Sequence, residues 1–119
     1  MIEIKYMKSV SGFDNCFNLV YCEKEYIPES YFKNNEKGDR AQIRYYLDLF
    51  EKNGICKRNS GREIIWSAHW NCRIDGIPFS MDYDADWDMV SFSIGEKYIE
   101  KREYVANALK KLIEKAKDW

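Results

Sequence analysis

The sequence predicts an α+β fold in which an antiparallel sheet of about five strands carries two main helices packed on one face. Several segments alternate apolar and polar residues, which is the period of a strand with one face in water. Two segments, at about 39–53 and 97–117, instead carry apolar residues at helical spacing. The expected element order, β-β-α-β-β-β-α, places consecutive strands next to each other as antiparallel neighbours.

The chain length favours a single globular domain spanning residues 1–119. A chain of 119 residues, 16% of them aromatic, can bury one core without the help of disulfides. The opening run M-I-E-I-K-Y-M-K lacks the apolar stretch of a secretory signal. No apolar run approaches the roughly 18 residues of a membrane span. We therefore expect a cytoplasmic protein with no membrane partner.

The first half of the chain is expected to hold two strands and one helix. Residues 1–8 and 16–22 alternate or concentrate apolar side chains and read as a strand hairpin, whereas 23–37 reads as irregular. Asp39 can accept hydrogen bonds from the first turn of a helix. Gly54 suits the left-handed position that ends one. These two residues bound the first predicted helix.

The second half is expected to begin with three strands in residues 63–94. Asp75-Gly76 is the signature of a type I′ hairpin turn. Apolar side chains then change from odd to even positions along the chain, as Phe79, Met81 and Tyr83 give way to Val90, Phe92 and Ile94. One continuous strand would leave half of them in water. Asp84 to Asp88 is therefore placed at a hairpin tip.

The inward parity of the strands and the apolar stripes of the helices predict the core. A buried leucine in such a position contributes several kcal/mol to stability, about 2–5 when it is cut to alanine. The predicted core residues are Ile43, Leu47, Phe50, Ile64, Trp66, Trp70, Phe79, Val90, Phe92, Val105, Leu109 and Leu112.

The cysteines at positions 16, 22, 56 and 72 show no C-x-x-C spacing and no histidine cluster. In a cytoplasmic protein this indicates four reduced thiols. Two disulfides in an oxidising compartment are the alternative. A zinc site is disfavoured, because zinc ligands usually come in close pairs.

The most distinctive feature is a block of uncompensated negative charge. No lysine or arginine occurs between Arg73 and Lys97, although the net charge of the chain is only -1. Acidic side chains beside aromatic rings are typical of a surface for a basic partner, because complementary charge speeds encounter and selects the partner. The expected partner-binding residues are Asp82, Tyr83, Asp84, Asp86, Trp87, Asp88 and His69.

Other interpretations of the acidic block are weaker. Asp82 begins an aspartate spacing that resembles an EF-hand, but Trp87 stands where glycine is needed and Ser93 where a bidentate glutamate is needed. Another cation site and a merely solvated acidic turn stay open as alternatives. We expect no cofactor and no metal.

Sequence motifs give no support for catalysis. His69 is the only histidine and has no nucleophile at motif spacing. Phosphate-binding loops, nucleophile elbows and zinc-protease motifs are absent from the sequence. Asp84 and Asp86 are compatible with an acidic-site metal-dependent enzyme, which is the alternative to binding. We expect a protein that is not an enzyme.

Direct nucleic-acid binding is also not expected. Residues 36–62 and 97–119 each contain seven basic and four acidic residues, so positive charge is interspersed with negative charge. Such mixed faces are usually solvated, and a pI near 5.9 argues against a phosphate-binding role.

The run G-I-P-F-S-M-D-Y-D-A-D-W-D-M-V-S-F-S-I, Gly76 to Ile94, precedes a lysine-rich helical segment. This half of the chain resembles the strand, acidic turn and strand of immunity proteins from bacterial polymorphic-toxin and contact-dependent-inhibition systems. The resemblance implies a stoichiometric inhibitor that binds a toxin effector domain, often a basic nuclease. It would occlude the active site or substrate groove of that toxin. A small peptide-binding scaffold module is the remaining alternative.

Overall fold

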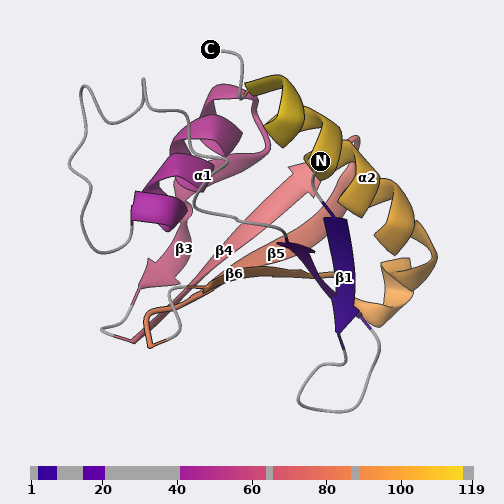
Figure 1. Cartoon of the computed structure of the whole chain (residues 1–119), viewed down its shortest axis with the longest axis horizontal. Coiled ribbons are helices and arrows are strands. Elements are labelled where there is room, and N and C mark those ends of the chain that lie inside the picture. The colour runs from indigo at the N-terminus through magenta and orange to yellow at the C-terminus, as the bar shows by residue number, and fades with distance from the viewer. Residues whose placement is uncertain (1–2, 8–14, 21–40, 64–65, 87–88, 117–119) are drawn as a thin grey trace.

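The computed structural model describes residues 3–7, 15–20, 41–63, 66–86 and 89–116. It confirms the α+β class (Figure 1). A six-stranded antiparallel sheet has the order β1-β2-β6-β5-β4-β3. Two α-helices and a 3₁₀ helix, η3, complete the described part. The elements are β1 Glu3–Met7, β2 Cys16–Val20, α1 Ala41–Lys52, β3 Cys56–Glu63, β4 Ser67–Ile74, β5 Ile77–Asp84, β6 Met89–Ser93, η3 Glu96–Lys101 and α2 Arg102–Ala116.

The predicted strand parities of the central hairpin are confirmed. In β5 the odd-numbered Phe79, Met81 and Tyr83 are buried, in β6 the even-numbered Val90 and Phe92 are buried, and Asp84 pairs with Met89 across the turn. The chain therefore reverses between these two residues, as the change of parity required. Asp75 and Gly76 both have positive φ, 48° and 80°, which is the geometry of the predicted type I′ turn.

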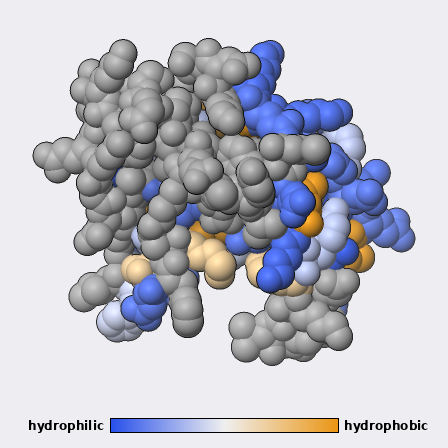
Figure 2. All heavy atoms as spheres, in the orientation of Figure 1, coloured by the Kyte–Doolittle hydropathy of each residue, from blue (hydrophilic) through white to orange (hydrophobic). Residues whose placement is uncertain are grey.

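Both helices lie over the same face of the sheet (Figure 1). Val105, Leu109 and Ile113 of α2 are fully buried, and they share one core cluster with the apolar residues of α1 and the strands. The exposed side of α2 is hydrophilic (Figure 2). α1 is buried beyond its predicted stripe, since Tyr45 and Leu49 are each 1% exposed.

Phe92 of β6 is the centre of the aromatic core. Its ring stacks on Phe17 of β2 at 5.3 Å between centroids and meets the edge of Tyr46 of α1 at 6.2 Å. Phe50 and Phe79 lie at 6.2 and 6.4 Å from the same ring. One side chain thus joins the N-terminal hairpin, the central hairpin and the first helix.

The helix boundaries differ slightly from the predicted ones. Gly54 has φ +70°, and the amides of Gly54 and Ile55 donate to the carbonyls of Glu51 and Phe50, which is a Schellman ending. The predicted cap at Asp39 lies outside the described residues. At the other helix, the predicted segment 97–117 divides into the 3₁₀ helix η3, whose backbone is kinked at Tyr98, and α2, which begins at Arg102. No helix among the described residues is long and apolar enough to cross a membrane.

Nine of the predicted core residues are buried, and one is wrong. Trp66 is 60% exposed, because β4 begins at Ser67 and Trp66 lies in a bend before it. Leu112 is only partly buried, and Ile64 lies outside the described residues. The buried nine are Ile43, Leu47, Phe50, Trp70, Phe79, Val90, Phe92, Val105 and Leu109.

The edge strand β3 was not predicted. Its sequence, C-K-R-N-S-G-R-E, shows no apolar alternation. It pairs with β4 at Cys56↔Cys72 and again at Gly61↔Trp70, so five steps along β3 match two steps along β4. The three additional residues form a bulge. Hydrogen bonds from Ser60 Oγ to the carbonyls of Lys57 (2.6 Å) and Asn71 (3.1 Å) hold that bulge against β4.

Leu109→Ala should lower the free energy of unfolding by about 2–5 kcal/mol, because its fully buried side chain leaves a cavity under the sheet. Leu112→Ala, three positions along the same helix and only partly buried, is the matched control and should cost clearly less. Urea unfolding curves measure both. Equal losses in the two variants would contradict the placement of Leu109.

Gly61→Ala should destabilise the protein by about 1–3 kcal/mol. A methyl group at Gly61 would lie 2.2 Å from the Trp70 ring and 2.4 Å from the His69 carbonyl oxygen, so the edge strand must shift. Gly95→Ala is the control, because nothing lies within 4 Å of its added methyl group. Thermal unfolding of both variants decides the matter; an unchanged midpoint for Gly61→Ala would refute the close contact.

Candidate functional site

The sheet presents a polar face opposite the helices, named here the open face. Because side chains alternate along a strand, the residues between the buried positions of β4, β5 and β6 point to this second face. All of them are exposed or half-buried, and most are small and polar. The open face consists of Ser67, His69, Asn71, Arg73, Ser80, Asp82, Asp84, Met89, Ser91 and Ser93.

A hydrogen-bonded pair, His69 and Asp82, lies near the middle of the open face. His69 Nδ1 lies 2.7 Å from Asp82 Oδ1, and the two side chains are 48% and 41% exposed. The two residues are directly opposite in the register of β4 and β5. The two-residue turn sets this register, because every pair in the hairpin is equidistant from Asp75-Gly76. The turn sequence Asp75-Gly76 therefore already implies that His69 and Asp82 are opposite each other, although a search for motif spacing does not find this pair.

The hydrogen bonds of His69 limit what the pair can do chemically. Its second ring nitrogen, Nε2, lies 3.4 Å from Asn71 Oδ1. A hydrolytic triad needs a hydroxyl or thiol at that nitrogen. None of the contacts seen for His69 in the described part of the chain supplies one. The geometry is that of an oriented, half-exposed polar pair suited to making hydrogen bonds with a bound group.

A hollow of about 370 Å³ surrounds this pair. Arg62 of the edge strand borders it on one side and Ser91 of β6 on the other. Arg62 pairs with His69, and Ser91 pairs with Asp82, so one cross-strand row runs through the hollow. Its lining is Arg62, Ser67, Ala68, His69, Asp82, Tyr83, Asp84, Met89 and Ser91.

The acidic tip continues from this row to the end of the β5–β6 hairpin. Asp84 is the last residue of β5 and is half-buried, whereas Asp86 is exposed. The Asp86 amide donates to Asp84 Oδ1 at 2.9 Å, so the first turn of the tip has a defined shape. Asp88 and Trp87 lie outside the described residues.

Tyr83 does not belong to the surface on which it was expected. Its side chain is 3% exposed and lies in the core, on the opposite side of β5 from Asp82 and Asp84. The odd parity that places Met81 in the core applies equally to Tyr83. This corrects the expectation that the Tyr83 ring contacts a partner.

Trp66, which was expected in the core, is an exposed aromatic residue. The Ala85 amide donates to the Trp66 carbonyl oxygen at 3.0 Å, so Trp66 lies directly beside the acidic tip. Among the described residues, Trp66 and not Tyr83 is therefore the exposed aromatic side chain beside the acidic tip.

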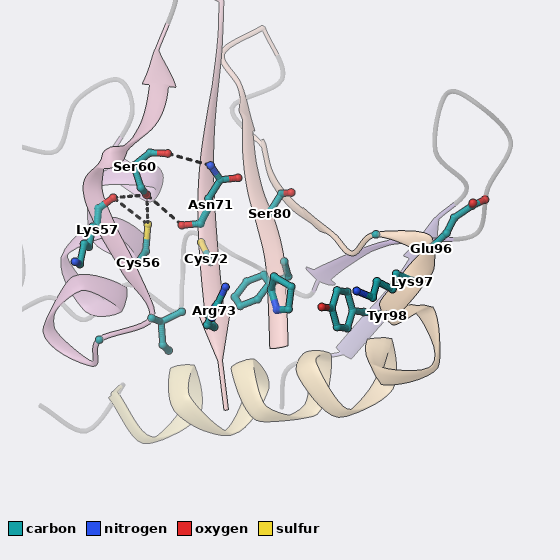
Figure 3. Close-up of a pocket in the computed structure, with 15 residues that line it drawn as sticks. Cys56, Lys57, Ser60, Asn71, Cys72, Arg73, Ser80, Glu96, Lys97 and Tyr98 are labelled. Atoms are coloured by element: carbon teal, nitrogen blue, oxygen red, sulfur yellow. Dashed lines mark hydrogen bonds between the residues drawn. The ribbon is translucent and has the colours of Figure 1, made fainter. Parts of the chain in front are cut away.

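The opposite end of the open face carries positive charge. A second hollow, of about 720 Å³, lies where β3, β4 and β5 meet η3. Arg73 of β4 and Lys97 of η3 lie on either side of it, and Lys57 belongs to the β3 bulge that borders it (Figure 3). Among the described residues that line it, Glu96 is the one carboxylate. The face is therefore acidic near the β5–β6 tip and basic near η3.

The described residues contain no group of three or more His, Cys, Asp or Glu side chains arranged to hold a metal ion. The acidic tip has two described carboxylates, Asp84 and Asp86, joined through a backbone amide rather than converging on one point. Comparison of the chain with protein-family models, curated proteins and solved structures found no match.

Proposed function

We propose that this protein is a cytoplasmic immunity protein that binds a cognate toxin domain, a basic nuclease, and neutralises it by occluding its active site or substrate groove. The observation that supports the proposal is the acidic end of the open face. Asp82, Asp84 and Asp86 lie there within one hairpin, together with exposed His69 and Trp66.

Negative charge on the β5–β6 hairpin is not balanced by nearby cations in the sequence. Residues 74–96 contain no lysine or arginine, so the field of the tip is not cancelled along its own strands. A groove that binds nucleic acid is lined with cations that neutralise phosphates. Carboxylates on a protruding hairpin can meet the same cations, and complementary fields of this kind raise association rates by about 10- to 1,000-fold.

The basic end of the open face supports one orientation of the partner. Arg73 and Lys97 border the second hollow and form no ion pair with a described carboxylate. A uniformly basic partner surface would be repelled there, whereas one with a basic groove and an acidic rim would match both ends. Like-charge contacts at an interface cost several kcal/mol, about enough to exclude the reversed orientation.

Trp66 supplies the contact area that charge alone cannot. Tryptophan is among the residues most often found to dominate the energy of an interface, because it buries a large area with few rotatable bonds. Its position beside Ala85 places the ring next to the charged tip. Charge would govern how fast the partner arrives, and the ring would govern how long it stays.

Co-expression tests the function as a whole. The chain is expressed together with the product of its neighbouring gene, and cell survival and complex formation are measured. We expect protection and a stoichiometric complex. If the cells are not protected and no complex forms, the proposal is overturned. Thermal stabilisation of the protein by calcium or magnesium alone would favour the acidic-site enzyme instead.

Asp84→Asn combined with Asp86→Asn should leave the fold intact and slow association with the toxin domain by roughly 10-fold or more at low salt. The association rate should also depend less on salt concentration, because the variant has fewer charges for salt to screen. Stopped-flow mixing measures both quantities.

The matched control for that variant is Glu100→Gln combined with Glu103→Gln. It changes the net charge by the same amount, but on exposed positions of η3 and α2. It should associate almost as fast as the unmodified protein. Equal slowing in both double variants would mean that net charge matters and the acidic tip does not.

Trp66→Ala should act on dissociation, raising its rate by roughly 10- to 30-fold with little change in association. Folding should be unaffected, because the ring is 60% exposed. Ile99→Ala, an exposed apolar position on η3, is the control. Surface-based kinetics distinguish the two; an unchanged dissociation rate for Trp66→Ala would remove this ring from the interface.

A further inference from the structure

Cys56 and Cys72 face each other across the seam between the edge strand and its neighbour. They are direct partners in the antiparallel register of β3 and β4. The Arg73 amide donates to the Ile55 carbonyl oxygen at 2.8 Å, so residues 55 and 73 form the hydrogen-bonded pair. In an antiparallel ladder the next pair along is not hydrogen-bonded. Cys56 and Cys72 occupy that position.

This position has the spacing that a disulfide needs. Cα atoms of non-hydrogen-bonded pairs lie about 4.5 Å apart. A disulfide spans Cα separations of about 4.4–6.8 Å. The backbone can therefore keep its register while the two sulfur atoms join.

The two cysteines are cross-strand neighbours, and both line a hollow at the sheet surface. A hydrogen bond with Cys56, followed by burial, raises the pKa of Cys72, so its thiol is protonated in the reduced protein. Both residues are buried, yet both line the hollow of about 720 Å³ that opens on the basic end of the open face (Figure 3). Cys56 Sγ also lies 3.9 Å from Ser60 Oγ in the bulge.

We propose that Cys56 and Cys72 form an oxidisable dithiol that closes into a cross-strand disulfide. The reaction breaks two S–H bonds and makes one S–S bond. With a peroxide as oxidant, two electrons and two protons pass to hydrogen peroxide, whose O–O bond breaks to give two water molecules. The third described cysteine, Cys16, cannot substitute, because β6 and β5 separate its strand from β4.

The disulfide would fasten the first residue of β3 to the sheet. Along the rest of this seam β3 is held by its antiparallel pairing with β4 at Gly61, Arg62 and Glu63 and by the Ser60–Asn71 hydrogen bonds. A covalent link between residues 56 and 72 restricts the unfolded chain and stabilises the folded one. The oxidised protein should melt roughly 10 °C above the reduced protein.

The test treats the full-length, folded, reduced protein with excess hydrogen peroxide. Remaining thiols are alkylated with iodoacetamide under denaturing conditions without reductant, and the chain is digested with trypsin. We expect one linked pair of peptides, Asn53–Lys57 with Glu63–Arg73. The link should disappear with dithiothreitol, and the melting temperature should return to that of the reduced protein.

Variants make the result specific. Cys56→Ala and Cys72→Ala should each abolish the linked peptides, whereas Cys16→Ala should retain them. The proposal is overturned if both thiols stay alkylatable after oxidation, if Cys56 links to a different cysteine, or if the link forms only when the protein is oxidised in urea. The peptide map of the unmodified chain decides these outcomes even where an alanine variant does not fold.

Discussion

The packing around Phe92 is the constraint on which the rest of the structure depends. This ring lies on one of the two central strands and contacts Phe17, Phe79, Tyr46 and Phe50. Because aromatic pairs of this geometry add to the free energy of apolar burial, the contacts hold α1 and the inward side chains of β2, β6 and β5 together on one face of the sheet. That face is then fully occupied by the core. The opposite face of the central strands is left to polar side chains.

The open face follows from the same alternation and from the type I′ turn. With Phe79 and Met81 directed inward, Ser80 and Asp82 are directed outward, and the turn at Asp75-Gly76 places Asp82 opposite His69. Charge is then sorted along the strands, with aspartates toward the β5–β6 tip and Arg73 toward η3. A flat polar face with opposite charge at its two ends favours one partner orientation, which is the basis of the proposed function.

The edge of the sheet depends on a different set of contacts. β3 has no apolar stripe, so its attachment relies on backbone pairing with β4, on the close approach of Gly61 to Trp70 and on the hydrogen-bonded bulge at Ser60. Edge strands are the part of a sheet most open to unwanted pairing. The Cys56–Cys72 pair lies at the start of this weakly apolar strand, where a covalent link would restrain it most.

The sequence by itself determined the fold class, the central hairpins and the part of the core that lies on regular apolar stripes, because these depend on the period of apolar residues and on local turn chemistry. The burial of Tyr83 was also implied by its parity. Only the tertiary structure decided the pairing of β2 with β6, the presence of β3 and the exposure of Trp66. These depend on contacts between distant segments: Phe17 stacked on Phe92, Gly61 beneath Trp70, and Ala85 bonded to Trp66. Local patterns carry no record of such contacts, because each is selected by the shape and hydrogen bonding of a remote neighbour.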